Sequence, residues 1–316
     1  MNLRHYIPQL ESIVDNNYKF TFTVFTPVYN AEKTINRVHE SLLKQSFDDF
    51  EWVIINDGST DGSHEVILDI INSSPLNIAY INNKKNKHKM ACFFQAVNLA
   101  NGHLFLTFDA DDECFPTALE TFNNEYYALS EKEREYIIAV TGLCVDQNRN
   151  AIGNQFNPNP LISDTFETTA IKNITGEKWG FTSTKHLQSI TFNDCFIENG
   201  FMMEGIIWTL FAKNGYKTKY INSIVRIYHT DIENSISSSS HEKTALGAVI
   251  YNIVIFNWFY KKHALAAPKF FLKNLYFLIS KSKYLNLDLK NYIASIDSLV
   301  IKFLFIILWP LRYFFK

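Results

Sequence analysis

The chain has 316 residues, of which 47% are hydrophobic, 20% charged and 15% aromatic. This composition supports a packed core and excludes a disordered chain, a collagen-like repeat and a small disulfide scaffold. The formal net charge is −2, but residues 261–316 hold ten Lys or Arg and two acids, which leaves 20 basic and 30 acidic residues before them. The acidic body argues against a nucleic-acid partner, because binding phosphates needs clustered cations.

The cysteines and the start of the chain predict a cytoplasmic protein. The cysteines lie far apart and form no CxxC pair, at positions Cys92, Cys114, Cys144 and Cys195. We therefore expect neither a zinc site nor a disulfide framework, and a reducing compartment fits. Residues 1–11 hold no apolar stretch of signal-peptide length, so no export signal is expected.

Short apolar runs alternate with helical patterns through the first half of the chain. The runs predict strands, and the spacing between them predicts helices, at residues 21–28 (strand), 31–45 (helix), 50–55 (strand), 63–71 (helix), 76–81 (strand), 90–100 (helix), 103–108 (strand) and 136–141 (strand). This order is typical of a largely parallel sheet wrapped by helices.

Polar clusters follow three of these strands. They are Tyr29-Asn30, residues 56–59 (NDGS) and residues 109–112 (DADD). Ligands of an open α/β sheet bind at the carboxyl ends of its strands, so we expect the clusters to converge.

The DADD cluster places Asp109, Asp111 and Asp112 within four residues. Carboxylates this close repel one another, and a buried position after a strand needs a cation, hydrogen-bond donors or open water to compensate. A divalent metal that bridges carboxylate and diphosphate oxygens meets this need. The alternative is an acidic helix N-cap, which suits Asp112 but leaves the other two acids unexplained.

The second half has fewer landmarks. Residues 143–180 predict loops and short strands, residues 202–212 a helix, and residues 219–228 a strand that ends just before His229. The Ser-rich residues 235–240 predict a flexible connection. We place the boundary there, between a domain of residues 1–235 and a helical extension of residues 236–316.

The segments VFTPVYNAEKTINRVHESLLKQSFDDFEWVIINDGSTDGS and LANGHLFLTFDADDE resemble the nucleotide-binding half of family 2 glycosyltransferases with the GT-A fold. The resemblance covers roughly residues 20–120 and, more weakly, residues 175–235. It implies a nucleotide-sugar half at residues 20–120 and an acceptor half at residues 121–235. It also implies an inverting, Mn²⁺- or Mg²⁺-dependent transfer of a sugar from a nucleotide sugar, most often a UDP-sugar, to a hydroxyl of a glycan or lipid-linked acceptor.

The resemblance assigns donor-site roles to the residues that match its motifs. The family's DXD motif falls on Asp109 and Asp111, which implies contacts to the ribose and to the metal and diphosphate. Asp57 is implied to read the uracil imide, and Asn56 stands where the family often has another Asp. The wall around the base and ribose is implied at Pro27, Tyr29 and Glu32.

A segment around Glu204 resembles the one that supplies the family's catalytic base, commonly an acid pair. Gly205 takes the place of the second acid, so the base is Glu204 or comes from elsewhere, and a solvated Glu at a helix start is the alternative. His229 is a candidate metal or diphosphate ligand or a structural His. Further candidates are Lys87 and Lys89 for the diphosphate, or as part of a solvated loop, and Trp179 and Asp112 for the acceptor pocket.

Residues 299–316 (LVIKFLFIILWPLRYFFK) are intensely apolar, yet Lys302 and Arg312 leave only nine residues between charges. A spanning helix needs about 20 predominantly apolar residues. Trp309, Tyr313 and the cations suit peripheral contact with a membrane interface, and packing on the body or on a partner subunit is the alternative. With a lipid-linked acceptor, this segment would place the protein at the inner face of the cell membrane.

Two other functions compete with transfer. A non-catalytic sugar-nucleotide-binding or scaffolding protein is suggested by Gly205. A nucleotidyltransferase is less favoured, because no Gly-rich basic signature stands near the first strand. The chain also lacks the GxGxxG turn of dehydrogenases and the GxxxxGK[ST] loop of NTPases. The sequence makes no prediction of the oligomeric state.

Overall fold

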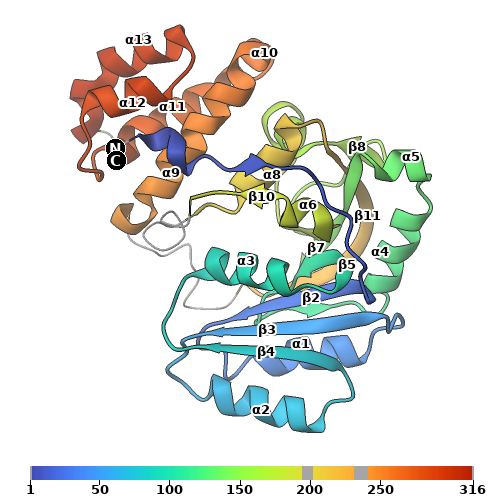
Figure 1. Ribbon diagram of the computed structural model, residues 1–316. Coiled ribbons are helices and arrows are strands. Elements are labelled where there is room, and N and C mark those ends of the chain that lie inside the picture. Colours follow the sequence, from blue (N-terminus) through green and yellow to red (C-terminus); the bar gives the residue numbers. More distant parts are fainter. Residues whose placement is uncertain (1, 194–201, 231–240, 315–316) are drawn as a thin grey trace.

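The computed structural model describes residues 2–193, 202–230 and 241–314. Its centre is a mixed sheet, which has nine strands in the described part of the chain (Figure 1). The strand order is β4-β3-β2-β5-β9-β7-β11-β6, with β8 paired to β11. The strands are β2 (Phe20–Val28), β3 (Phe50–Asp57), β4 (Asn77–Asn83), β5 (Gly102–Thr107), β6 (Glu113–Cys114), β7 (Ile137–Asp146), β8 (Leu161–Ser163), β9 (Lys178–Ser183) and β11 (Lys217–Tyr228). A separate pair is β1 (Gln9–Leu10) with β10 (Ile190–Thr191).

The strands expected in the first half all form, and β4, β3, β2 and β5 are mutually parallel. The strand predicted near residues 219–228 forms as β11, which is parallel to β7. The antiparallel strand β9 lies between β5 and β7 and interrupts the otherwise parallel order. The carboxyl ends of β2, β3 and β5 therefore meet at one edge, as the alternation predicted.

The pleat of the sheet sends neighbouring residues to opposite cores. Val24 of β2 lies opposite Trp52 of β3, and both join the cluster formed with α1, α2 and α4. Phe25 lies opposite Val53, and both join the cluster formed with α3 and α8. Helices therefore cover both faces (Figure 1). These helices are α1 (Ile35–Leu43), α2 (Ser63–Ser73), α3 (Lys89–Leu99), α4 (Ala118–Tyr127) and α8 (Gly205–Lys213).

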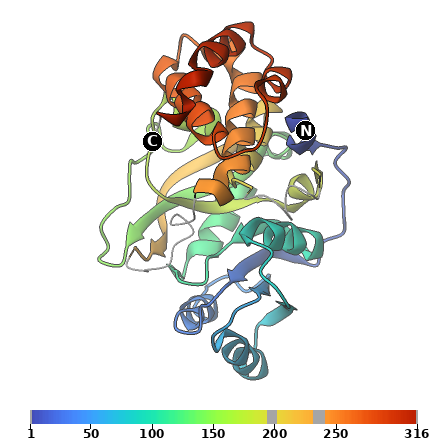
Figure 2. The ribbon, with the colours of Figure 1, turned by 90° about the vertical axis from the view of Figure 1, so that its left-hand side faces the viewer.

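The C-terminal helices form a bundle on the α8 side of the sheet, and Figure 2 shows it as a cap at one end of the molecule. Its elements are α9 (His241–Ile255), η4 (Phe256–Tyr260), α10 (Lys261–His263), α11 (Pro268–Ser282), α12 (Leu289–Ser295), α13 (Leu299–Leu308) and η5 (Trp309–Tyr313). The helix α11 begins at Pro268, whose fixed φ and missing N–H suit a first turn. The described residues after position 240 are therefore mainly helical, and the predicted domain boundary at residues 235–240 lies outside the described residues.

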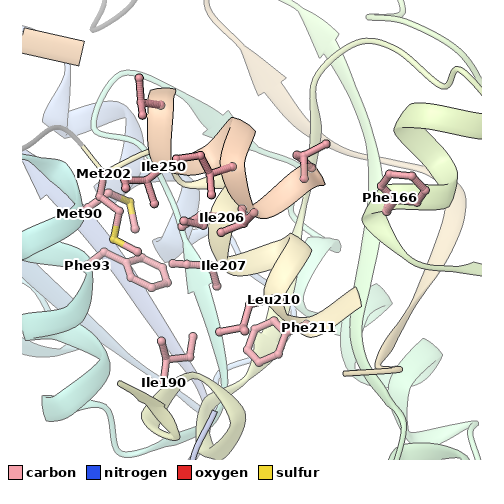
Figure 3. Packing of buried hydrophobic residues seen from close by; sticks show 14 of the residues in the cluster. Met90, Phe93, Phe166, Ile190, Met202, Ile206, Ile207, Leu210, Phe211 and Ile250 are labelled. Carbon is pink, nitrogen blue, oxygen red and sulfur yellow. The ribbon is translucent and has the colours of Figure 1, made fainter. Parts of the chain in front are cut away.

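The bundle and the sheet share one apolar core. Ile206 and Ile207 of α8 lie between Phe93 of α3 and Ile250 of α9 (Figure 3). All four side chains are at most 2% exposed. The helix α8, which the catalytic candidate Glu204 precedes, is therefore packed on both sides.

Short elements complete the chain. Arg4 of the N-terminal turn forms an ion pair with Asp297, and its Nε donates to the Ala294 carbonyl at 3.1 Å. This contact ties the start of the chain to the C-terminal bundle. The short elements are η1 (Leu3–Tyr6), α5 (Glu131–Arg134), η2 (Glu167–Ile171) and α6 (Thr184–Gln188).

Candidate active site

Hydrogen bonds join the loops that follow β2 and β3. The Asn30 side-chain oxygen accepts from the Thr60 backbone N–H at 2.8 Å, and the Asn30 backbone N–H donates to Ser59 Oγ at 2.9 Å. Asn30 has a φ of +53°, a left-handed conformation that Asn tolerates better than most residues. The first two predicted polar clusters therefore lie together.

The implied donor wall sits on these loops. Tyr29 is 53% exposed, so its ring is open to a ligand. Glu32 is tied to the neighbouring loop, because its Oε2 accepts from the Gly62 N–H at 3.2 Å and its own N–H donates to Asp61 at 3.1 Å. A Cβ on Gly62 would lie 2.8 Å from Glu32 Cδ. Glu32 thus supports the loop, and Pro27 in β2 is half-buried.

Asp57 ends β3 and is 4% exposed. Its Oδ1 accepts from the Lys87 backbone N–H at 2.8 Å. Gly58 has a φ of +71°, and a Cβ there would lie 2.8 Å from Asn86 N, so glycine lets the basic loop close over β3. The structure therefore brings Asp57 and Lys87 together, through the backbone of Lys87 and not its side chain.

The carboxylate of Asp109 lies between two cations. Lys89 Nζ, at the start of α3, is 2.6 Å from Oδ1, and Arg226 Nη2 is 3.0 Å from Oδ2. Burial on its own raises the pKa of Asp109, but the two cations outweigh it and hold that pKa well below its usual range. Burial likewise lowers the pKa of Lys89, and the charges of Asp109 and Glu204 reverse the effect and raise it. This pair is ionised at neutral pH.

Arg226 organises the acidic segment from β11. The register pairs Arg226 with Cys114 of β6, so the guanidinium faces the residues just before that strand. Arg226 is 3% exposed and forms ion pairs with Asp109, with the fully buried Asp112 and, at 3.7 Å, with Glu177. Burial raises the pKa of Glu177, and the charges of Asp109 and Glu204 add to this against the effect of Arg226.

The sequence reasoning did not identify Arg226 or Glu177. A signal was present, because Arg226 interrupts the apolar run between Val225 and Ile227. All three residues are buried, and a cation inside a strand covered on both faces needs acidic partners.

Asp111 differs from its neighbours in having no ion-pair partner within the described ranges. Burial and the adjacent Asp109 raise its pKa. Its main-chain oxygen accepts from Arg37 Nη1 at 3.0 Å, which fixes the backbone beneath it. A half-buried carboxylate without a direct ion pair, beside a second carboxylate, fits a divalent ion.

The donor chemistry fits Mn²⁺ or Mg²⁺ shared with a ligand. In residues 2–193, 202–230 and 241–314 no group of three His, Cys, Asp or Glu side chains is arranged to hold a metal alone. Mg²⁺ is commonly bound through one or two carboxylates together with substrate phosphates. Asp109 and Asp111 match that pattern.

His229 lies beside this cluster but contacts other groups. Its backbone N–H donates to Asp112 Oδ1 at 2.8 Å, and its Nε2 is 2.9 Å from Glu113 Oε1. The predicted neighbourhood of His229 and the DADD segment is therefore present, and the ring nitrogen faces Glu113.

Trp179 and Asp112 do not line an open acceptor pocket, so this prediction is wrong. Trp179 is 4% exposed, its Nε1 donates to the Thr107 carbonyl at 2.6 Å, and its ring packs on Phe108. Asp112 is 0% exposed beneath Arg226. Both residues support the floor of the site from within, because the indole completes the core and the carboxylate neutralises a buried cation.

Glu204 occupies the position just before α8, makes no side-chain capping hydrogen bond and is half-buried. Its charge raises the pKa of both Lys89 and Glu177, which places it in the same electrostatic cluster as Asp109. A Cβ on Gly205 would lie 3.3 Å from the Tyr251 ring. Gly205, which takes the place of the second acid implied by the resemblance, is thus packed against α9.

A mixed sheet covered by helices on both faces, with acidic residues after β3 and β5 at one edge, is the arrangement of the GT-A fold class. The chain superposes on Staphylococcus aureus TarS 1–349 in complex with UDP-GlcNAc with a TM-score of 0.57 and 18% identity, over 93% of this chain and 86% of that one. The expected fold is therefore confirmed. The model of Glycosyl transferase family 2 matches residues 23–187, and the chain belongs to this family of glycosyltransferases.

Two relatives have informative names. The putative glycosyltransferase EpsE of Bacillus subtilis is 32% identical over 123 residues, which cover 39% of this chain and 43% of EpsE. The chondroitin synthase of Pasteurella multocida is 26% identical over 216 residues, which cover 66% of this chain and 21% of the synthase. The chain thus spans less than half the length of either relative.

Proposed function

We propose that the protein is a metal-dependent inverting glycosyltransferase that moves a sugar from a UDP-sugar to a hydroxyl of a glycan or lipid-linked acceptor. One observation supports this function most strongly. Asp109 and Asp111 follow β5 at the edge of the sheet where Asp57 ends β3. The charge of Glu204 also raises the pKa of Lys89, which forms an ion pair with Asp109. The relatives named chondroitin synthase and hyaluronan synthase, and the TarS complex with UDP-GlcNAc, are consistent with a UDP-sugar donor.

The donor would lie over the ends of β2 and β3. The exposed ring of Tyr29 offers an apolar face to the base or ribose. Asp57 would accept the imide N–H of uracil, whereas the corresponding ring nitrogen of cytosine is an acceptor and would be repelled. The loop that carries Lys87 and Lys89 would lie along the diphosphate, where its cations lower the cost of bringing phosphate charge to an acidic cluster.

Asp109 and Asp111, with His229 at the margin, would hold the metal. When bound, Mn²⁺ or Mg²⁺ supplies charge neutralisation for the departing nucleoside diphosphate. Lys89 and Arg226 keep Asp109 ionised and oriented for this role.

Glu204 would accept the proton of the acceptor hydroxyl as its oxygen attacks the anomeric carbon from the side opposite the diphosphate. A single displacement of this kind inverts the anomeric centre. Glu204 precedes α8, whose apolar side chains are part of the core, and general-base assistance is typically worth about 10²- to 10⁴-fold in rate. We place the reaction at the cytoplasmic face of the cell membrane.

A panel of nucleotide sugars with Mn²⁺ or Mg²⁺ tests this function, with thermal stabilisation and donor turnover as readouts. We expect a UDP-sugar and metal together to stabilise the protein against thermal unfolding. In Glu204→Gln we expect turnover to fall about 10²- to 10⁴-fold while this stabilisation persists. Stabilisation without turnover by any acceptor would indicate a sugar-nucleotide-binding protein instead. Pyrophosphate release would indicate a nucleotidyltransferase.

A further inference from the structure

The helix α13 is apolar on two opposite sides. Ile301 and Phe305 are at most 2% exposed, and the Phe305 ring packs on Tyr292 with centroids 5.3 Å apart. Phe303 and Ile307 are 63% and 53% exposed. At 3.6 residues per turn the exposed residues form one stripe along the side away from the core. This outer strip consists of Leu299, Val300, Phe303, Ile306 and Ile307.

More apolar surface follows in η5 and at Phe314 just after it. Leu311, Tyr313 and Phe314 are 45%, 64% and 83% exposed. The Arg312 guanidinium lies 3.9 Å from the Trp309 ring centroid and 4.3 Å from that of Tyr313. A cation held on aromatic rings next to exposed aliphatic side chains matches the chemistry of a headgroup boundary.

The segment that carries the strip is strongly basic. Residues 261–314 hold nine Lys or Arg and two acids. Of the acids, Asp297 is paired with Arg4, and Asp288 lies 3.5 Å from Lys290. A second copy docked through the same face would bring like charges together, whereas an anionic surface would be complementary.

We propose that α13 and η5 dock on an anionic lipid bilayer, with the outer strip in the headgroup and acyl boundary and the helix parallel to the surface. No helix within the described ranges is long and apolar enough to cross a bilayer, which agrees with a surface position. The inner side, with Ile301 and Phe305, stays packed on the bundle. In this arrangement one side of α13 packs on the body of the protein and the opposite side contacts lipid, so the two interpretations of residues 299–316 are compatible.

Because the bundle shares its core with α8, docking would hold Glu204 at a fixed height above the bilayer. This consequence rests on the proposed function, since it matters only for an acceptor carried by the membrane. Vesicle binding itself requires neither donor nor acceptor, so the two proposals fail separately.

Sedimentation of the full chain with vesicles tests the docking. The vesicles contain phosphatidylcholine alone or phosphatidylcholine with phosphatidylglycerol. We expect binding to the anionic vesicles that weakens with salt, and binding about tenfold or more weaker for Phe303→Ser/Ile307→Ser. The control Leu43→Ser/Leu68→Ser removes side chains that are 45% and 40% exposed on α1 and α2 and should bind like the parent.

Cooperative urea unfolding without vesicles should be retained by the parent and both double variants, which shows that the variants are folded. Equal vesicle binding by the parent and Phe303→Ser/Ile307→Ser would overturn the proposal. The proposal would also be overturned if the parent did not bind anionic vesicles. It would equally be overturned if vesicle binding were absent and Phe303→Ser/Ile307→Ser abolished a concentration-dependent self-association of the parent. The last result would assign the outer strip to a second copy.

Discussion

Arg226 contacts Asp109 and Asp112 through the same nitrogen, Nη2, although its side chain is only 3% exposed. Burial on its own lowers the pKa of Arg226, and the two carboxylates reverse this and raise it. The guanidinium is therefore a permanent charge inside the acidic segment. It couples β11 to the DADD residues, and the pairing of Arg226 with Cys114 fixes that contact in the sheet.

Replacing Arg226 should destabilise the fold strongly. Arg226→Met leaves the 0% exposed Asp112 carboxylate without its cation, and breaking a buried ion pair from one side costs about 3–5 kcal/mol. Urea unfolding measures the loss in the free energy of unfolding. Arg226→Met/Asp112→Asn should recover part of it, because the buried charge is gone. A loss of less than about 1 kcal/mol in the free energy of unfolding of Arg226→Met, against the expected loss of about 3–5 kcal/mol, would contradict a buried ion pair between Arg226 and Asp112.

Asp111→Asn should abolish the metal response and yet stabilise the ligand-free protein. Burial and Asp109 raise the pKa of Asp111 above its ordinary 3.8. A raised pKa means that the ionised form is penalised in the folded state, so Asp111 reduces stability above that pKa and the penalty disappears as the pH falls through it. At neutral pH the neutral Asn removes the penalty. Asp111→Asn also removes a negatively charged oxygen ligand of the proposed metal, so the response to metal should be lost.

Thermal unfolding with and without Mn²⁺ and UDP measures both effects. The melting temperature of Asp111→Asn should be equal to or above that of the parent without ligands, and should no longer rise on adding metal with UDP. Asp69→Asn removes a carboxylate exposed on α2 and serves as the matched control. Full metal-dependent stabilisation in Asp111→Asn would exclude this residue from the metal site.

The parallel half of the fold was predictable because its signals are local. The run at β3, residues 50–57, is buried throughout, and such strands are recognisable as continuous apolar segments. The placement of β9 between β5 and β7 depends on the pairing of Phe181 with Leu106 and Val140. These contacts are distant in sequence and leave no periodic trace.

The position of a candidate residue was predictable where it follows directly from a strand end, as for Asp57 and Asp109. It was not predictable where a residue reaches the site across the sheet, as Arg226 does. Trp179 was misassigned because an aromatic side chain near a polar segment suits a ligand pocket and a core equally. Its indole N–H finds the Thr107 carbonyl inside the protein, and this contact depends on the β9 pairing.

Asp57→Asn should weaken the preference for uracil. The amide oxygen of Asn can still accept from the Lys87 N–H, a bond of 2.8 Å in the parent, so the basic loop should stay in place. The lost hydrogen bond to a charged acceptor is worth about 1.5–3 kcal/mol, or roughly tenfold or more in UDP affinity. The amide N–H would also donate to cytosine.

Titration calorimetry with UDP and CDP in the presence of Mn²⁺ measures this preference. The ratio of UDP to CDP affinity should fall in Asp57→Asn and stay unchanged in Asp69→Asn. An unchanged ratio in Asp57→Asn would remove Asp57 from base recognition while leaving the diphosphate site untouched.

His186 should make the fold sensitive to acid. The side chain is 3% exposed in α6, its ring lies 4.8 Å from that of Tyr216, and Nδ1 has no hydrogen-bond partner in the part of the chain that the structure describes. Burial, with a smaller effect of Lys185, lowers the pKa of His186 from 6.5 to about 4. The unfolded chain therefore binds a proton more readily than the folded one.

The contribution of His186 to stability is fully present above pH 6.5 and is lost as the pH falls toward about 4. The loss amounts to roughly 3 kcal/mol over that interval, at about 1.4 kcal/mol for each pKa unit. Urea unfolding at several pH values between these limits should give a shallower pH dependence for His186→Phe than for the parent. His5→Gln changes an exposed His and should follow the parent. Parallel curves for His186→Phe and the parent would show that His186 is not buried in its neutral form.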